Sequence, residues 1–165
     1  MILINNSNVY NLVRAVYSAR NPMNSWSKSD SDLMKDILGP NDLNLAKRLC
    51  KAGSDHRKFL RQIFVSVDIT APLYWWKEYD TYKVGTTANS TSTMHKIHSK
   101  PITVDDFSFD DGLDTIQTKE EIETLISIYE NIRLNYIDNK EKNVWRALIQ
   151  LLPSSYNQTR TCTMT

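Results

Sequence analysis

Helix signals occur in three stretches of the first third of the chain. Residues 9–17 carry apolar side chains at positions i, i+3, i+4 and i+7, which predicts a helix with one buried face. We expect two more helices, over residues 31–38 and 42–52. Gly39 and Gly53 follow these stretches, and glycine readily adopts the left-handed backbone that ends many helices.

The last third of the chain predicts two further helices. Thr118 and Glu121 form a capping box, in which the hydroxyl and the carboxylate each satisfy a backbone N–H at the start of a helix. Asp138 and Glu141 repeat this pattern ahead of a second helix, which Pro153 follows. The apolar face of the first helix comprises Ile122, Leu125, Ile126, Tyr129, Ile132 and Tyr136.

Other stretches predict extended structure. Residues 59–69 alternate between two sets of side chains and give the clearest strand signal. A helix over residues 72–79 is expected next, because proline is favoured in a first helical turn. Residues 86–93 are β-branched and polar, which favours an extended segment or a loop. Residues 156–165 carry threonine at nearly every second position and are expected to be extended.

Composition narrows the class of protein. A chain of 165 residues can bury a hydrophobic core without disulfide bonds or metals, so we expect one domain. Its net charge of +1 provides no global field that would draw it to nucleic acid or to an anionic membrane. Cys50 and Cys162 form neither a disulfide framework nor a metal-ligand motif. With no signal peptide and no long apolar run, we expect a cytoplasmic protein.

Metal and phosphate-loop chemistry are both disfavoured. His95 and His98 are spaced as zinc ligands on a helix could be, but a third ligand is missing and Lys96 and Lys100 add positive charge. The acidic residues between 105 and 114 lack the ligand order of an EF-hand, which favours a solvated loop. Four glycines in the whole chain leave no glycine-rich phosphate cradle. We therefore expect no bound metal.

Residues 75–98 combine aromatic side chains, lysines and hydroxyls. Trp75, Trp76 and Tyr82, interleaved with lysines, could stack on bases as in proteins that bind single-stranded nucleic acid. The same aromatic residues at helical spacing are also typical of a core or an interface. The pattern alone leaves both interpretations open, with the core interpretation favoured.

The order of motifs in this region resembles the flavin-dependent thymidylate synthases (ThyX). Those proteins have a helix that ends near Gly-His, a strand that closes on Ala-Pro, a helix that finishes in Arg-His-Arg, and a Ser/Asn-rich stretch. This chain has the segments KAGSDH, IFVSVDITAP, LYWWKEYDTYK and TANSTSTM in the same order. A later segment, ALIQLLPSSYNQTRTCTMT, is similar to the family's helix ending in Leu-Pro and the extended segment after it.

The resemblance implies an α+β fold, with a small antiparallel or mixed sheet packed against helices. It also implies a homo-oligomer, commonly a tetramer with shared active sites. Family members bind FAD and deoxyuridine monophosphate (dUMP) and methylate the uracil ring with a methylene group from a folate, while the flavin delivers a hydride. A divergent chain that retains only nucleotide binding is a further form of the same expectation.

The resemblance assigns residues to two ligands but leaves the catalytic residues unknown. His56 and Lys83 fall where contacts with FAD are expected, and Tyr79 or Tyr82 could stack on a ring. The nucleotide set, in which lysines supply charge and Asn89 and Ser92 supply hydrogen bonds, comprises Lys77, Tyr82, Asn89, Ser92, Lys96 and Arg146.

Several departures from the family pattern keep a second class of function open. Residues 81–83 read Thr-Tyr-Lys where the family has Arg-His-Arg, Met94 replaces the loop arginine, and Ile149 replaces an arginine one turn after Arg146. Lysine cannot reproduce the planar fork with which arginine grips phosphate. We also expect the family's final Arg- and Gln-containing helix to be missing. The alternative is a non-catalytic structural or interaction protein on the same fold, with Trp75 and Trp76 on an assembly surface.

Overall fold

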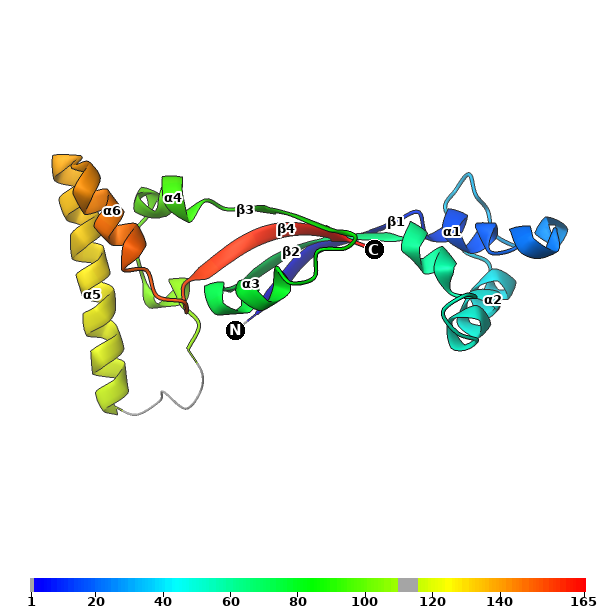
Figure 1. The fold of residues 1–165 in the computed structure, drawn as a ribbon, viewed down its shortest axis with the longest axis horizontal. Helices are drawn as coiled ribbons and strands as arrows, with labels where there is room; N and C mark the ends of the chain where they lie inside the picture. The colour runs from blue at the N-terminus through cyan, green and yellow to red at the C-terminus, as the bar shows by residue number, and fades with distance from the viewer. Residues whose placement is uncertain (1, 110–115) are drawn as a thin grey trace. The chain divides into compact units, whose positions relative to one another are not determined.

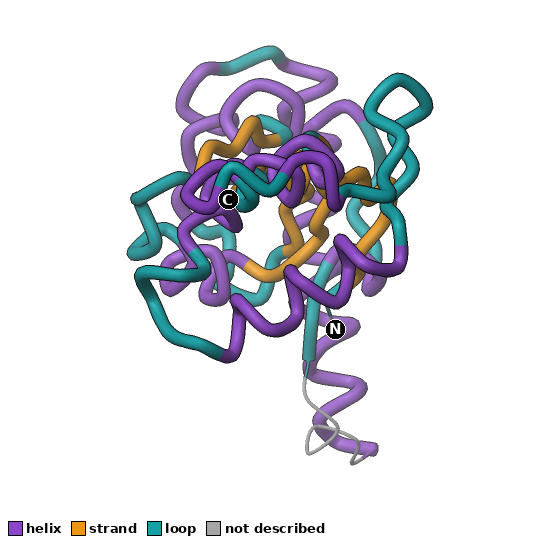
Figure 2. Tube along the Cα trace, turned by 90° about the vertical axis from the view of Figure 1, so that its right-hand side faces the viewer, coloured by secondary structure: helices purple, strands orange, loops and turns teal. Residues whose placement is uncertain are grey.

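The structure is a computed structural model that describes residues 2–109 and 116–165. Helices and strands are interspersed along the chain (Figure 1), and helices make up more of the backbone trace than strands do (Figure 2). In chain order the main elements are β1 (Leu3–Tyr10), α1 (Leu12–Ser18), α2 (Pro40–Lys51), β2 (Phe64–Pro72), α3 (Leu73–Tyr79), β3 (Thr86–Ser90), α4 (Thr93–Lys96), α5 (Ile116–Asn139), α6 (Lys142–Gln150) and β4 (Asn157–Met164).

The four strands form one antiparallel sheet in the order β1-β2-β4-β3. Hydrogen-bonded side-chain pairs define the register of its two central strands, since the residue number falls by two on β2 for each rise of two on β4. The pairs are Thr70 with Thr159 (2.7 Å), Asp68 with Thr161 (2.6 Å) and Ser66 with Thr163 (3.3 Å). The expected α+β fold with a small sheet is confirmed.

The chain divides into two compact units, and each strand of the sheet passes from one unit to the other. Unit 1 contains Met1–Asn5, Asp68–Lys83 and Ala88–Thr161, and unit 2 contains Asn6–Val67, Val84–Thr87 and Cys162–Thr165.

The core of unit 1 lies against the helical hairpin of α5 and α6 (Figure 1). Lys140 connects the two helices with a left-handed backbone (φ 57°), which allows the chain to reverse within two residues. The Tyr129 hydroxyl donates to the Leu151 carbonyl at 2.6 Å and ties the hairpin together. The buried apolar residues of this core are Ile97, Ile102, Phe107, Tyr129 and Leu148.

Unit 2 is organised around a buried ion pair. The Arg20 guanidinium binds the carboxylate of Asp42 on α2, and both side chains are almost completely buried. The hydroxyls of Ser29 and Ser31 donate to the other carboxylate oxygen, each at 2.5 Å. Burial alone would raise the pKa of Asp42, but the hydrogen bonds from Ser29, Ser31 and Arg20 outweigh burial and hold that pKa below its usual value.

The N-terminus of α2 is capped by a residue from outside the helix. Gly39, at the N-cap position, has no side chain to accept the first N–H groups. The Asp30 carboxylate accepts them instead, from Asn41 at 2.8 Å and Asp42 at 3.1 Å. A Cβ on Gly39 would collide with Asp30, so this glycine is required by the close approach of the cap.

Two expectations for the N-terminal third need correction. The helix expected over residues 9–17 begins only at Leu12, because Asn11 adopts a left-handed backbone (φ 63°) that separates it from the unforeseen strand β1. Residues 31–38 form a turn closed by a bridge between Asp32 and Ile37 instead of a helix. The Asp32 carboxylate accepts the N–H groups two and three residues ahead, which competes with helical hydrogen bonding. The helix over residues 42–52 is confirmed as α2.

Further along the chain, most elements are confirmed but their starts differ. The strand expected from residue 59 starts at Phe64, after a 3₁₀ turn over Lys58–Gln62. Both capping boxes are wrong. Helix α5 already begins at Ile116, so Thr118 lies inside it, and Glu141 precedes α6 without a side-chain cap. The helix over residues 72–79 and the extended C-terminal segment are confirmed.

Two surface expectations also change. Trp76 is 1% exposed and its indole N–H donates to the Gln158 carbonyl at 2.9 Å, so it is a core residue and no part of an assembly surface or stacking platform. Asp106, expected in a solvated loop, is buried, and the acidic residues 110, 111 and 114 lie outside the described part of the chain. Among the described helices, none has the length and apolar character needed to cross a membrane.

We expect Asp42→Asn to lower the free energy of unfolding by about 3 to 5 kcal/mol, because it leaves the Arg20 guanidinium buried without a counter-charge. Urea denaturation measures this change. The matched control is Asp32→Asn, since Asp32 pairs with Lys35 at 3.8 Å on the surface and contributes little. An equal loss of stability in the two variants would contradict the role given to the buried pair.

Stability should also fall in acid. The native pKa values of Asp42 and Glu130 lie below the usual 3.8 and 4.5, in Glu130 mainly because Arg133 donates to its carboxylate. Their contribution is therefore complete above about pH 4.5 and is lost as the pH falls through the lowered native values. Urea unfolding over a pH series measures this decline. Asp42→Asn should show a shallower decline than the parent chain, and an unchanged slope would count against Asp42.

Candidate functional site

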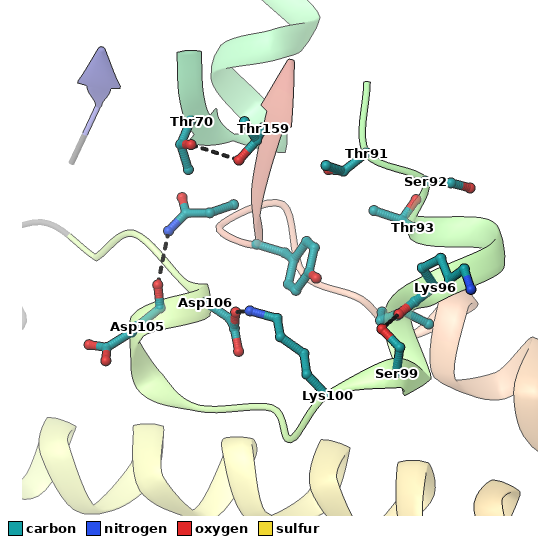
Figure 3. Close-up of a pocket in the computed structure, with 13 residues that line it drawn as sticks. Thr70, Thr91, Ser92, Thr93, Lys96, Ser99, Lys100, Asp105, Asp106 and Thr159 are labelled. Carbon is teal, nitrogen blue, oxygen red and sulfur yellow. Dashed lines mark hydrogen bonds and ion pairs between the residues drawn. The ribbon is translucent and has the colours of Figure 1, made fainter. Parts of the chain in front are cut away.

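A cavity of about 370 Å³ opens in unit 1 where three segments of the chain meet. They are the end of β2, residues 91–106 and the start of β4 (Figure 3). We name it the hydroxyl pocket because side-chain hydroxyls line much of it, from Thr70, Thr91, Ser92, Thr93, Ser99 and Thr159.

Strand pairing brings these hydroxyls together. Thr70 on β2 and Thr159 on β4 share a hydrogen bond between their hydroxyls at 2.7 Å. The Thr91 N–H donates to the Thr159 carbonyl at 2.9 Å, which continues the β3–β4 pairing past the end of β3. One wall of the pocket is thus an extension of the sheet.

Gln158 fixes the start of the segment that carries Ser92 and Lys96. Its side-chain amide donates to the Thr91 carbonyl at 2.7 Å, and its own backbone carbonyl accepts the Trp76 indole N–H. Its amide oxygen accepts the Nε–H of Arg160 at 3.0 Å, and the Arg160 guanidinium lies 4.2 Å from the centre of the Trp76 ring. Helix α3, strand β4 and the pocket loop are therefore joined through one buried glutamine.

The carboxylate side of the pocket is formed by Asp105 and Asp106. Asp106 binds the Lys100 ammonium and accepts the Thr103 backbone N–H at 2.9 Å. The hydrogen bond from Lys100 to Asp106 raises the pKa of the lysine and keeps it charged. Burial raises the pKa of the neighbouring Tyr156, and the negative charge of Asp106 raises it further, so the phenol is neutral at neutral pH.

Lys96 and Ser92 form the opposite side of the pocket. Figure 3 shows Ser92, Thr93 and Lys96 on one side and the two aspartates on the other, with Lys100 reaching toward Asp106. In the part of the chain that the structure describes, Lys96 has no ion-pair partner, so its charge is available to a ligand. The Ser92 oxygen accepts the His95 N–H at 3.1 Å, and its own O–H can still donate.

The structure brings only two of the predicted nucleotide residues into this pocket, Ser92 and Lys96. Arg146 lies on α6 and lines a separate cavity of about 310 Å³ with Met94 and Trp145. The remaining nucleotide residues are exposed and lie on α3, in the turn after α3 and on β3; they are Lys77, Tyr82 and Asn89.

Several lining residues were missed by the sequence reasoning. Thr159 carried a signal, since the threonine alternation of residues 159–165 predicted a strand with one hydroxyl face. Lys100 and Asp106 carried no sequence signal, because their pairing depends on the path of the chain between them, which ends in a 3₁₀ turn over Val104–Asp106. Tyr156 and Asn157 also line the pocket, at the point where β4 begins.

The metal hypothesis gains no support from the geometry. Over residues 2–109 and 116–165, no three His, Cys, Asp or Glu side chains gather as metal ligands would. His95 is exposed, whereas the His98 ring packs edge-on against Tyr136 with 5.0 Å between ring centres.

Comparison with solved structures identifies the fold. A ThyX from Helicobacter pylori, crystallised with FAD and dUMP, matches over 99% of this chain and 77% of its own, with a TM-score of 0.69 and 15% identity. The UMP/dUMP methylase PolB from Streptomyces cacaoi, bound with 5-Br dUMP, matches over 100% of this chain and 72% of its own, with a TM-score of 0.62 and 13% identity. The chain has a ThyX-like fold. No protein-family model and no curated protein sequence matches it.

The two residues expected to contact FAD are both on the surface. His56 is exposed in unit 2, in the segment between α2 and β2, and Lys83 is exposed in unit 1, after α3. Neither lines the hydroxyl pocket or the cavity beside Arg146. The contacts with FAD therefore stay a prediction, and we derive no step of chemistry through a flavin.

We expect Gln158→Ala to lower the free energy of unfolding by about 1 to 3 kcal/mol, because the Thr91 carbonyl and the Arg160 Nε–H lose a buried partner. Chemical denaturation measures the change. Gln150→Ala, at the exposed end of α6, is the matched control and should remain within about 0.5 kcal/mol of the parent. If the two variants were equally stable, Gln158 would have no joining role.

Proposed function

We propose that the chain binds a uridine monophosphate, dUMP or UMP, in the hydroxyl pocket. The observation that carries this proposal is the separation of charge across the pocket, with the unpaired Lys96 on one side and Asp105 on the other (Figure 3). A volume of about 370 Å³ lies within the range of small-ligand sites, roughly 300 to 1,000 Å³.

The two sides suit the two ends of a nucleotide. The Lys96 ammonium and the hydroxyls of Ser92 and Thr93 are donors, and a phosphate offers only acceptors near neutral pH. On the other side, the Asp105 carboxylate and the Asn157 side chain offer acceptors for the uracil N–H or a ribose hydroxyl. The likeness in fold to proteins crystallised with dUMP and 5-Br dUMP supports the choice of a uridylate.

Methylation of dUMP with FAD and a methylene-folate is the fuller form of the proposal. FAD would bind through His56 and Lys83, in a homo-oligomer whose active sites are shared between copies. Arg146 lies beside Met94, the residue that replaces the family's loop arginine, and could restore a guanidinium to that region.

A non-catalytic protein on the same fold is the second candidate. The missing guanidinium groups at residues 81–83 and 94 favour it, because lysine and methionine cannot grip phosphate with a planar fork. Under this candidate the hydroxyl pocket would bind a nucleotide weakly or not at all, and the fold would serve assembly.

We expect Lys96→Ala to weaken dUMP binding about tenfold or more, because one charge-assisted phosphate contact contributes about 1.5 to 3 kcal/mol. Isothermal titration calorimetry with dUMP and UMP measures this loss. Lys35→Ala is the matched control: the Lys35 side chain is 75% exposed, outside the hydroxyl pocket, and its removal should leave affinity unchanged. Unchanged affinity in Lys96→Ala, or an equal loss in the control, would refute the assignment.

Measuring FAD and dUMP binding on the same purified protein distinguishes the two candidate functions. Retained or added FAD with stoichiometric flavin absorbance, reduced in His56→Ala, would support the enzyme lineage. A colourless protein that binds dUMP and is indifferent to FAD would support a nucleotide-binding relative, and indifference to both ligands would support the structural candidate.

A further inference from the structure

A second polar cavity, of about 600 Å³, lies in unit 2. It is formed by the end of helix α1, a short 3₁₀ turn over Trp26–Lys28 and one face of α2. Three of its lining side chains are cations, two are carboxamides and one is apolar, and none is a carboxylate. They are Arg20, Lys28, Arg48, Asn41, Asn44 and Leu45.

Helix geometry explains why one surface of α2 faces this cavity. Asn41, Asn44, Leu45 and Arg48 follow the i, i+3, i+4, i+7 spacing, which places their side chains on one face of a helix. The opposite face carries Ala46, which packs against Val16 in the core of unit 2. The face directed at the cavity therefore carries donor groups instead of the apolar residues that a buried face would require.

Among the described residues, one carboxylate binds this group of cations, and its hydrogen bonds are already satisfied. Asp42 accepts two hydrogen bonds from Arg20 and one from each of two serine hydroxyls. Its charge is thus cancelled by Arg20 and does not neutralise the rest of the cavity. Lys28 and Arg48 have no ion-pair partner among the described residues, so two of the cations that line the cavity are not neutralised by an ion pair.

Arg20 also has donors to spare. A guanidinium has five N–H groups. Those of Arg20 make two hydrogen bonds to Asp42 and a long one of 3.5 Å to the Ser25 carbonyl. No described residue accepts the other two, although the side chain is only 7% exposed. The ion pair with Asp42 holds this buried guanidinium in one orientation at the wall of the cavity.

We infer that this cavity binds a ligand carrying linked phosphate groups. Its walls offer ammonium, guanidinium and carboxamide donors with no competing carboxylate, which matches the several acceptor oxygens of an oligophosphate. The volume exceeds that of the hydroxyl pocket, and the charges come from three separate segments, which suits more than one phosphate. The cations converge on one concavity of a chain with net charge +1, which favours a small anion over a nucleic acid.

The test is isothermal titration calorimetry of the full chain with inorganic pyrophosphate, tripolyphosphate and orthophosphate. We expect saturable binding that is tighter for pyrophosphate than for orthophosphate. Arg48→Gln and Lys28→Gln should each weaken pyrophosphate binding by about tenfold, because each removes a charge-assisted contact. Glutamine keeps the helix propensity of arginine on α2, so an unchanged melting temperature is expected.

Two further variants separate this site from general charge and from the hydroxyl pocket. Lys35→Gln removes an exposed charge of unit 2 outside the cavity, and should bind pyrophosphate as the parent does. Lys96→Gln removes the charge of the hydroxyl pocket, and should weaken pyrophosphate binding less than Arg48→Gln does. Absence of saturable pyrophosphate binding, unchanged affinity in Arg48→Gln, or an equal loss in Lys35→Gln or Lys96→Gln would overturn the inference.

A titration with a nucleoside diphosphate shows whether the linked phosphates belong to a nucleotide or to a free oligophosphate. A nucleoside diphosphate that binds more tightly than pyrophosphate, with the same loss in Arg48→Gln, would identify a nucleotide as the ligand. Equal or weaker binding would identify a free oligophosphate. A single-stranded oligonucleotide that binds more tightly than either, and is weakened equally by Lys35→Gln, would overturn the assignment to a small anion.

Discussion

The pairing of β4 with both β2 and β3 is the interaction on which the rest of unit 1 depends. Strand β4 lies between β2 and β3, so β3 joins the sheet only through β4, a strand that follows it by more than 60 residues. One face of β4 presents Thr159 to the hydroxyl pocket, and the other presents Gln158 and Arg160 to helix α3. A single strand thus contributes to the core and to the candidate site.

The sequence predicts most of the fold because most elements are specified locally. The periodic apolar residues of α2, α5 and α6 and the alternation in β2 and β4 can be recognised within a window of a dozen residues. Strand β1 cannot, since all eight of its residues are exposed and its Asn5 and Asn6 interrupt any apolar pattern. It is held by pairing with β2, and pairing between distant segments leaves no local signal.

In the candidate site, too, the residues with a local sequence signal were predicted and those placed by distant contacts were not. Ser92 and Lys96 were predicted through the order of motifs along the chain, and the structure places both in one pocket. Thr70 and Tyr156 were not predicted, because they reach the pocket through pairing with Thr159 and Phe107, which are distant from them in the sequence. The polar cavity of unit 2 was not predicted for a related reason. Its cations come together only through packing, from Arg20, Lys28 and Arg48. The nearly balanced charge of the whole chain gives no sign of this local excess of positive charge.

The threonine repeat of β4 leaves its register with β2 ambiguous, and one side chain removes the ambiguity. A slip of β4 by two residues would still place a threonine hydroxyl opposite β2, because threonine recurs at positions 159, 161 and 163. Such a slip would, however, put Arg160 or Tyr156 where the Gln158 side-chain amide now donates to the Thr91 carbonyl. The glutamine therefore sets the register of an otherwise repetitive strand, and selects one alignment among several that backbone pairing alone would tolerate.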